Sequence, residues 1–330
     1  MAKGDHCAER VKRPLSRAPN VGDTVVVLPV LTESYLEKPV NVASVPQRSP
    51  FRYPGGKTWL VPRIRRWLAG LPEKPAEFYE PFAGGGIVSL TAAFERLAGH
   101  VTMVELDPQV AAVWHTILEE DGGAEWLAQR ILCFNLTKEA VETTLAAPSL
   151  RTREQAFQTI LKNRTYHGGI LAPGSALVKH GENGKGLQSR WYPTTLANRI
   201  REIARFRKSI TFIEGDGMEV IERNSGRAGA MWFIDPPYTA SKKKAGTRLY
   251  SHHELDHNRL FDLTKKLAGD FLMTYDDAEE LKDLARQHRF DTELVAMTNT
   301  HHATMRELLI GRNLDWVRTN QMSLLDLTAG

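Results

Sequence analysis

The segment Asp235-Pro236-Pro237-Tyr238 ends an apolar stretch, Ala230–Ile234. Proline has no backbone N–H and restricts the backbone, so the turn presents hydrogen-bond acceptors rather than donors. The Asp235 carboxylate and the Pro236 carbonyl can together hold the two N–H bonds of an exocyclic amine. Tyr238 adds a flat ring on which an extruded base can stack. We therefore predict a catalytic turn that aims the amine nitrogen at an electrophile, with Asp235, Pro236 and Tyr238 as its residues.

A strand-terminating proline turn with an exposed Asp is the alternative, and a glycine-rich segment upstream favours the catalytic interpretation. Phe82-Ala83-Gly84-Gly85-Gly86 lies between a predicted strand and a predicted helix. Glycine lets the backbone pass close to a ligand, and the helix N-terminus behind it has free N–H groups. The next predicted strand ends at Glu105-Leu106-Asp107, where an acid can accept hydrogen bonds from a ribose diol. Together these segments predict an adenosine-containing cofactor at the carboxyl end of a parallel sheet.

Two other motifs indicate different chemistry. Gly55-Gly56-Lys57-Thr58 resembles the end of a P-loop, but that pattern needs glycine at position 51, which is Phe51. The segment His253-Glu254-Leu255-Asp256-His257 matches the H-E-x-x-H motif of zinc peptidases. A capping box, Ser251-x-x-Glu254, places His253 in the first turn of a helix, and no third ligand follows at the metzincin spacing. A zinc peptidase stays as a remote alternative, and we expect no metal.

The elements that must position these motifs alternate between strand and helix, because apolar residues recur at strand or helix spacing. Strands are predicted at 78–82, 100–105, 210–214 and 230–234, and helices at 58–68, 88–97 and 108–118. Strand–helix alternation is expected to continue through 271–275, 278–286, 292–297 and 307–312. This order predicts an α/β fold with a doubly wound sheet.

The alternation is interrupted between about 119 and 205, where helical pieces precede a stretch rich in Gly, Pro, Lys and Trp. Residues 151–210 hold 12 Lys and Arg against 3 Asp and Glu, although the net charge of the chain is only +4. Such a segment is typical of a nucleic-acid-binding insert, and a solvated basic face is the alternative. We predict three parts: a poorly ordered extension (1–47), a catalytic domain (48–118 and 206–330) and an inserted target-recognition domain (119–205).

Composition is that of an ordinary soluble enzyme. The chain has 330 residues, of which 42% are hydrophobic and 25% charged. No apolar run approaches the roughly 18 residues of a spanning helix, so no membrane partner is expected. The two cysteines, Cys7 and Cys133, form no C-x-x-C motif and are interpreted as reduced thiols of a cytoplasmic protein.

Taken together, the motifs resemble those of the Dam-like (alpha-group) N(6)-adenine-specific DNA methyltransferases. The segments that carry the resemblance are Arg52–Lys57, Glu80–Gly86, Asn163-Arg164-Thr165, Gly215-Asp216 and Asp235–Tyr238. Their order, with the insert between the cofactor motifs and the DPPY motif, also matches that group. The resemblance covers roughly residues 48–325. It implies a Rossmann-like S-adenosylmethionine-dependent methyltransferase sheet with an inserted, mostly helical DNA-recognition module.

The resemblance further implies S-adenosyl-L-methionine as cofactor. The residues that it implies as cofactor contacts are Tyr53, Lys57, Phe82, Gly84, Gly86, Glu105, Asp107, Asp216 and Asp235. The family's ribose-binding acid is usually Asp, whereas this chain has Glu105. An aromatic residue commonly follows the Gly-Asp motif, whereas this chain has Gly217-Met218. The implied reaction is in-line methyl transfer to the 6-amino group of a flipped-out adenine in duplex DNA.

Double-stranded DNA is the implied partner. The predicted DNA-binding residues are Asn163, Arg164, Tyr166, His167, Lys185, Arg190 and Trp191, with Lys162, Lys179, Arg199 and Arg201 as further basic candidates. Trp191 also fits a small local core, and Arg199 also fits a solvated helix face. Cytosine N(4) is the closest alternative target, and Asp rather than Ser at position 235 favours adenine. A cognate restriction endonuclease encoded nearby is a candidate partner, and restriction–modification, phage and solitary roles stay open.

Overall fold

The computed structural model of the protein describes residues 40, 42–53, 55–181, 184–237, 255–298 and 304–318, all within one unit of the chain, residues 36–330. The predictions for Tyr238, for His253 and Glu254, and for residues 1–39 lie outside these residues. Val42–Ser44 forms a short 3-10 helix, and Val45 packs into the core, so the predicted extension reaches the folded part before residue 47. No helix among the described residues has the length and apolar character needed to cross a membrane.

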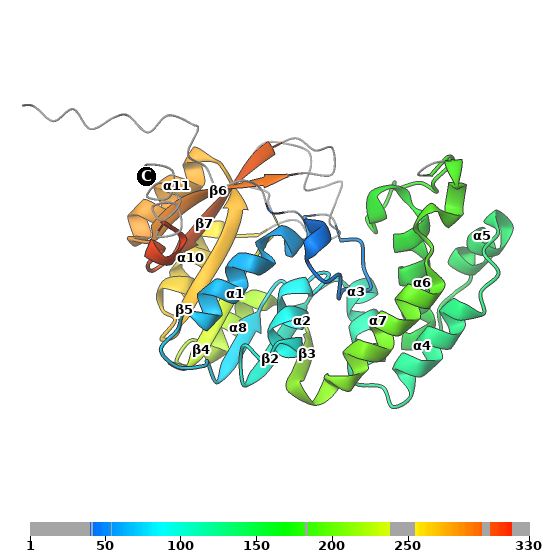
Figure 1. Cartoon of the computed structure of the whole chain (residues 1–330), viewed down its shortest axis with the longest axis horizontal. Coiled ribbons are helices and arrows are strands. Elements are labelled where there is room, and N and C mark those ends of the chain that lie inside the picture. The colour runs from blue at the N-terminus through cyan, green and yellow to red at the C-terminus, as the bar shows by residue number, and fades with distance from the viewer. Residues whose placement is uncertain are drawn as a thin grey trace, which may run out of the picture. The chain divides into compact units, whose positions relative to one another are not determined.

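Seven strands form one sheet with the spatial order β3-β2-β1-β4-β5-β7-β6 (Figure 1). They are β1 (Glu77–Glu80), β2 (His100–Glu105), β3 (Ile210–Glu214), β4 (Ala230–Ile234), β5 (Asp270–Asp276), β6 (Asp291–Thr298) and β7 (Thr304–Gly311). Strands β3, β2, β1, β4 and β5 are parallel. The chain order reverses at β1, which pairs with β4 so that Tyr79 lies opposite Trp232. The predicted α/β, Rossmann-like fold class is confirmed.

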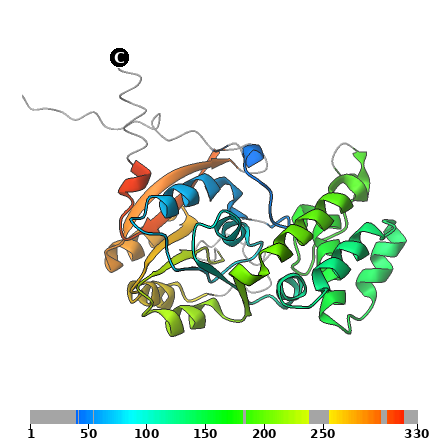
Figure 2. The same ribbon diagram turned by 60° about the horizontal axis from the view of Figure 1, so that its bottom comes forward.

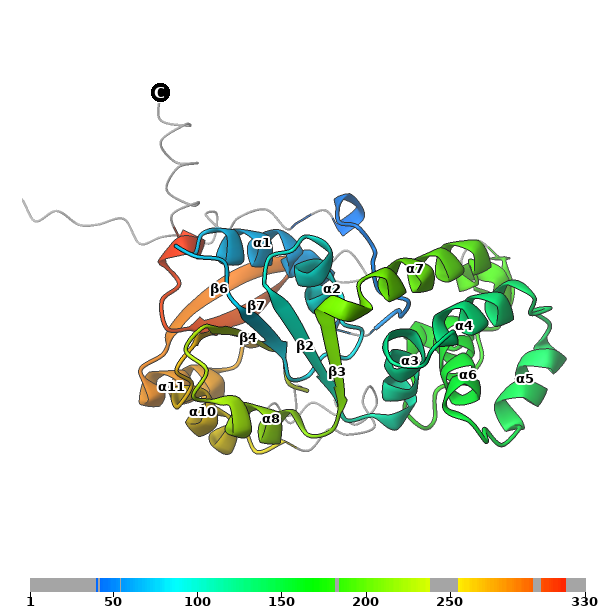
Figure 3. The same ribbon diagram turned by 90° about the horizontal axis from the view of Figure 1, so that it is seen from below.

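Helices cover both faces of this sheet (Figure 3). They are α1 (Val61–Ala69), α2 (Ile87–Phe94), α3 (Pro108–Leu118), α4 (Gly123–Leu132), α5 (Lys138–Ala146), α6 (Thr152–Thr165), α7 (Pro193–Arg205), α8 (Gly217–Asn224), α10 (His257–Lys265) and α11 (Glu279–His288). In β4, Met231 and Phe233 pack on the side of α1 and α2, whereas Trp232 and Ile234 pack on the side of α8, α10 and α11. Because both faces are covered, β4 is apolar at every position rather than at alternate ones.

The C-terminal part departs from the predicted alternation. Residues 307–312 were expected to continue a strand–helix order, but β7 pairs antiparallel with both β5 and β6. Leu308 and Ile310 are buried on one face of the sheet and Leu309 on the other. A short apolar run that is buried on both faces fits a strand and a helix equally well in its sequence pattern. Periodicity alone therefore could not predict whether residues 307–312 form a strand or a helix.

The insert is mostly helical, as predicted, and comprises α4 to α7 with short 3-10 turns at His167–Gly169 and Gly186–Arg190. Two further 3-10 turns lie outside it, at Lys57–Leu60 and Arg207–Ser209. These helices group beside the sheet (Figures 1 and 2). They share one hydrophobic core with it: Val101 of β2, Trp114 of α3 and Ile160 of α6 belong to the same cluster. Helix α3 connects the two, and the boundaries at 118 and 206 stay predictions.

Candidate active site

The carboxyl ends of the parallel strands line a cavity of about 1110 Å³. The segments after β1, β2, β3 and β4 all contribute, together with residues of α6 and α7. In open α/β sheets, ligands bind at this edge, where the strand order reverses. All nine residues predicted to bind the cofactor line this cavity: Tyr53, Lys57, Phe82, Gly84, Gly86, Glu105, Asp107, Asp216 and Asp235.

The glycine loop after β1 lies against the ring of Tyr53. Gly84 and Gly86 have φ angles of +49° and +64°, a region that favours glycine. A Cβ atom on Gly84 would come within 2.6 Å of the Tyr53 ring. From α3, the indole Nε1 of Trp114 donates a hydrogen bond to the Gly84 carbonyl at 3.0 Å. No residue larger than glycine therefore fits at position 84 of the loop without a shift of the Tyr53 ring.

Glu105, at the end of β2, fixes this loop. Its Oε2 accepts a hydrogen bond from the Gly84 N–H at 2.8 Å, and its Oε1 accepts from the N–H groups of Leu106 and Asp107, both at 2.8 Å. Burial raises the pKa of Glu105 to about 7, although the amide donors act in the opposite direction. A carboxylate oxygen can accept more than one hydrogen bond, so the contact of Glu105 with a ribose stays a prediction.

Asp107 and Asp216 cap the helices that follow β2 and β3. Asp107 Oδ1 accepts from the Gln109 N–H at the start of α3, and Asp216 Oδ1 accepts from the Met218 N–H at the start of α8, both at 2.8 Å. Each cap satisfies an N–H group that has no partner inside its helix. The caps fix both carboxyl groups at the rim of the cavity, and their contact with the cofactor stays a prediction.

The Asp235 carboxylate, directly after β4, is held by two donors from other elements. Thr274 Oγ1 on β5 donates to Asp235 Oδ1 at 2.7 Å, and Lys57 Nζ lies 2.9 Å from the same oxygen. Asp235, Pro236 and Pro237 all line the cavity. A carboxylate anchored by a cation and a hydroxyl is an acceptor that needs little reorganisation when a ligand binds. The catalytic roles of Asp235 and Pro236 stay predictions.

Lys57 contacts two carboxylates and a backbone carbonyl. Its Nζ donates to the Gly55 carbonyl at 2.9 Å and lies 2.9 Å from Asp235 Oδ1 and 3.1 Å from Glu307 Oε1 of β7. An ammonium group has three N–H donors, and these three partners use them. The side chains of Lys57 and Glu307 are 4% and 5% exposed. Lys57 lines the cavity and is the buried charge partner of Asp235, and its contact with the cofactor stays a prediction.

Glu80, the last residue of β1, is buried next to these charges. Its Oε2 accepts a hydrogen bond from the Ser89 N–H in the first turn of α2 at 2.8 Å. Burial raises the pKa of Glu80 to about 8, and the negative charge of Asp235 acts in the same direction, while Ser89 and Lys57 oppose the shift. At neutral pH the folded protein therefore favours the protonated form of Glu80.

We expect this carboxyl group to make folding less favourable as the pH rises. The folded state binds the proton more tightly than the unfolded chain, in which the pKa is 4.5. The stabilising effect is complete below that value and is lost as the pH rises toward about 8, at up to about 1.4 kcal/mol per pH unit. Urea unfolding between pH 5 and 9 measures this slope. Glu80→Gln, which stays neutral, should reduce the slope, and an unchanged slope would contradict the assignment.

Asn163 and Arg164 of α6, both predicted to contact DNA, form hydrogen bonds with the backbone of the chain. Asn163 is fully buried; its Oδ1 accepts from the Arg52 N–H at 2.9 Å, and its Nδ2 donates to the carbonyls of Arg52 at 3.0 Å and Gly169 at 2.7 Å. Arg164 donates from Nη2 to the Pro50 carbonyl. The amide of Asn163 is used inside the protein, and its contact with DNA stays a prediction. Arg164 does line the cavity.

Loss of the Asn163 amide should destabilise the protein. Asn163→Ala leaves the Arg52 N–H and two carbonyl groups without this partner, and an unmade buried hydrogen bond costs about 1–3 kcal/mol. We expect a decrease of that size in the free energy of unfolding, measured by urea denaturation. Asn198→Ala on α7, where the side chain is exposed, is the control and should change stability by less than about 0.5 kcal/mol. Equal effects of the two variants would refute this role.

The remaining predicted DNA contacts separate into three groups. Trp191 is 8% exposed and its ring lies edge-on to Phe134 at 6.0 Å, which agrees with the local-core alternative, and its DNA contact stays a prediction. Arg190 is half-buried and lines the cavity. Three residues are not part of the cavity lining, and their DNA contacts stay predictions: Tyr166, which is half-buried, and His167 and Lys185, which are exposed.

Three residues of the site escaped the sequence analysis. Thr274 lies inside a predicted strand, where a single polar residue between apolar ones is a weak signal. Glu307 precedes the apolar run Leu308–Ile310, and a buried acid there indicates a buried cation elsewhere in the chain. Arg52 stands beside the glycine-rich turn in the sequence and lines the cavity together with Arg164, Arg190 and Arg199.

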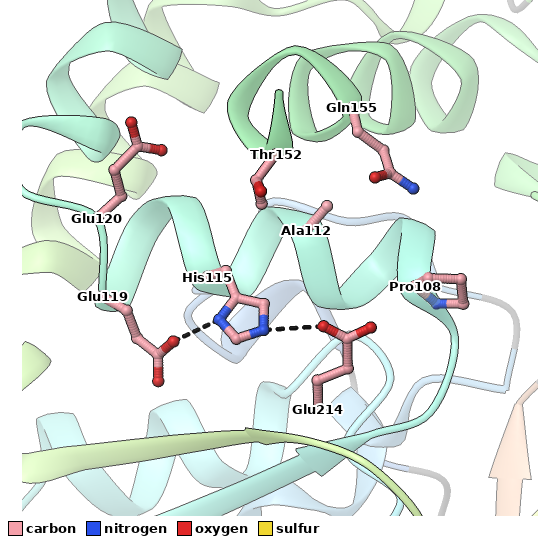
Figure 4. Close-up of a pocket in the computed structure, with 8 residues that line it drawn as sticks. All are labelled: Pro108, Ala112, His115, Glu119, Glu120, Thr152, Gln155 and Glu214. Carbon is pink, nitrogen blue, oxygen red and sulfur yellow. Dashed lines mark hydrogen bonds and ion pairs between the residues drawn. The ribbon is translucent and has the colours of Figure 1, made fainter. Parts of the chain in front are cut away.

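A second, smaller cavity of about 510 Å³ lies beside α3 (Figure 4). Here His115 contacts Glu119, and its Nε2 lies 3.0 Å from Glu214 Oε2. In the H-E-x-x-H motif, the described residue His257 begins α10, and its Nδ1 lies 3.0 Å from the Tyr275 hydroxyl. No group of three or more His, Cys, Asp or Glu side chains among the described residues is placed to hold a metal ion.

With this geometry established, comparison with known proteins connects the site to a family. Residues 53–125 match the family model of D12 class N6 adenine-specific DNA methyltransferases. This segment contains Tyr53, Lys57, the glycine loop and Glu105. The predicted resemblance to the adenine-specific DNA methyltransferases is confirmed. Over 266 residues, or 78% of the chain, the protein is 24% identical to the DNA N-6-adenine-methyltransferase of Escherichia phage P1, and it spans about a third (33%) of that relative's length.

Two methyltransferases are among the solved structures that the comparison matched. A putative RNA methyltransferase, PH1948 from Pyrococcus horikoshii, is 13% identical with a TM-score of 0.35, and the match covers 79% of this chain and 84% of that one. Precorrin-6y C5,15-methyltransferase from Geobacter metallireducens is 10% identical with a TM-score of 0.31, and the match covers 75% and 85% of the two chains.

Proposed function

We propose that this protein transfers a methyl group from S-adenosylmethionine to the 6-amino group of an adenine flipped out of duplex DNA. One observation carries the proposal: the anchored Asp235 acceptor and the glycine loop line the same cavity. The similarity of residues 53–125 to the N6-adenine family supports adenine as the target. Duplex DNA is then the substrate, and a cognate restriction endonuclease is a candidate partner.

The residues of the cavity fit the cofactor. At the glycine loop, a Cβ on Gly84 or on Gly86 would meet neighbouring side chains at 2.6 Å or 2.5 Å, so the backbone itself forms the surface offered to a ligand. Tyr53 and Phe82 provide apolar contact, and three acids provide acceptors for hydroxyl and amino groups: Glu105, Asp107 and Asp216. When bound, S-adenosylmethionine supplies a methyl group that is already activated by the sulfonium.

The protein then acts by positioning and electrostatics. Asp235 and the Pro236 carbonyl accept the two N–H bonds of the adenine amine, which turns the nitrogen lone pair away from them. Positive charge grows on this nitrogen during transfer, and the Asp235 carboxylate stabilises it. Lys57 and Thr274 keep the carboxylate in one orientation. A stacked base cannot reach the cavity, so the adenine has to leave the duplex, and its extra proton is released to solvent.

A labelling experiment tests this function. The protein is incubated with S-adenosylmethionine carrying a labelled methyl group and with genomic DNA that lacks adenine methylation, and the DNA is digested to nucleosides. We expect the label in N6-methyladenosine. Label in N4-methylcytidine would overturn the choice of target, and label that goes to RNA but not to DNA would overturn the choice of substrate.

A further inference from the structure

Four arginines from four different segments line one part of the cavity. Arg52 lies beside the glycine-rich turn, Arg164 on α6, Arg190 in the 3-10 turn Gly186–Arg190, and Arg199 on α7. We propose that this arginine cluster binds one phosphodiester group of the DNA strand whose base enters the active site. The inference rests on the proposed function and adds to it a specific anion subsite inside the catalytic cavity.

The cluster concentrates positive charge in a partly buried region of the cavity. Arg164 is 5% exposed, and Arg52, Arg190 and Arg199 are half-buried. Within the described part of the chain, Arg52, Arg164 and Arg199 form no ion pair with a carboxylate. Burial, and after it the charges of Arg199, Arg52 and Arg190, together lower the pKa of Arg164 to about 9. A buried group of like charges is unfavourable unless an anion joins it.

The protein nevertheless holds these side chains in place. Arg164 Nη2 donates to the Pro50 carbonyl, and Arg199 Nη1 donates to the Ser49 carbonyl at 3.2 Å. Asn163 binds both backbone groups of Arg52. The Arg164 Nε is buried and has no hydrogen-bond partner in the described structure. Since a guanidinium has five N–H donors, these bonds leave several donors for a ligand.

The chemistry of the cluster favours a phosphate over a base. Guanine is a common ligand of a single arginine, but it is neutral and does not offset several buried positive charges. A phosphodiester carries a full negative charge on two oxygens that guanidinium groups bind in a bidentate manner. The anchored Asp235 lines the same cavity, so a phosphate here would belong to a nucleotide near the flipped base.

The test measures how salt weakens DNA binding. Wild type, Arg52→Met and Arg199→Met are titrated with a fluorescein-labelled 24-base-pair duplex of mixed sequence at 50 to 300 mM NaCl. Loss of one phosphate contact should reduce the slope of log K against log salt by about 1. We expect affinity at the lowest salt to fall about fivefold to tenfold. Arg199→Lys keeps the charge and should restore most of the slope. Thermal denaturation checks that each variant is folded before it is titrated. If one methionine variant is unstable, the other still tests the proposal.

Arg205→Met is the matched control. Arg205 is on the same helix as Arg199, is exposed, pairs with Glu202 and does not line the cavity, so its variant should keep the wild-type slope. If the cavity variants kept the wild-type slope but methylated a different set of DNA sequences, the arginines would contact bases rather than a phosphate. That result would overturn the proposal. Weaker binding of S-adenosylmethionine with unchanged slopes would assign the cluster to the cofactor carboxylate and also overturn it. A reduced slope without methyl transfer by wild type would instead refute the proposed function and leave the anion subsite standing.

Discussion

Asp235→Ala should abolish methyl transfer while the affinity for S-adenosylmethionine stays within a few-fold of wild type. The variant loses the carboxylate acceptor that lines the cavity and is held by Lys57 and Thr274. Removal of a single preorganised charge-stabilising group typically lowers kcat by about 10²–10³-fold, and Asp235 also orients the amine, so we expect a loss at or above that range. Single-turnover transfer to DNA and calorimetric titration of the cofactor measure the two quantities separately.

Two further variants make this result specific. Asp235→Asn keeps the shape and one acceptor but lacks the negative charge, so it should lose nearly as much activity as the alanine variant. Asp121→Ala is the control, because the Asp121 side chain is 95% exposed and its exposed ion pair with Arg207 contributes little. Turnover of Asp235→Ala at the wild-type rate would contradict the proposed mechanism. Loss of cofactor binding in that variant would show that Asp235 serves the cofactor rather than the amine.

Of the proposed variants, Lys57→Met should show the largest decrease in the free energy of unfolding. The ammonium lies between the carboxylates of Asp235 and Glu307, and all three groups are largely buried. Methionine fills the space but leaves the two carboxylates facing each other without a cation. Removal of one member of a buried ion pair costs about 3–5 kcal/mol. We expect a loss of this size in urea unfolding at neutral pH, together with strongly reduced methyl transfer because Asp235 loses its anchor.

A double-mutant cycle separates charge from packing. Glu307→Gln removes the second carboxylate charge, so the variant with both Lys57→Met and Glu307→Gln should recover part of the stability but not the activity. We expect a coupling energy of about 0.5–3 kcal/mol between positions 57 and 307. Lys265→Met on α10, where the side chain is exposed, is the control for the loss of a lysine. Additive losses in the cycle would mean that the buried ion pair does not act as a unit.

The elements that position the site could be predicted because their signals are local. The strand Ala230–Ile234 was predicted with the bounds that the structure has, since an apolar run that ends in Asp-Pro-Pro has few other interpretations. The glycine loop was predicted for a similar reason, and the positive φ angles of Gly84 and Gly86 agree with the need for glycine there. Residues 307–312 lacked such a signal, and their antiparallel strand was not predicted.

Roles within the site were less predictable because they depend on partners far away in the chain. Lys57 was predicted to contact the cofactor, yet Asp235 and Glu307 use its donors. Asn163 and Trp191 have residue types suited to DNA binding, yet one binds the backbone of Arg52 and the other packs against Phe134. Residue type and spacing describe what a side chain can do, whereas burial and neighbours select which of those interactions it makes.

By itself, the sequence determined the strands β1 to β5, the glycine loop after β1 and the acidic turn after β4, because backbone propensity and hydrophobic period act over a few residues. Only the tertiary structure decided that Lys57 neutralises Asp235 and Glu307, and that four arginines share the cavity with them. Electrostatic interactions depend on distance in space and on exclusion of water, and both are set only when the segments fold together.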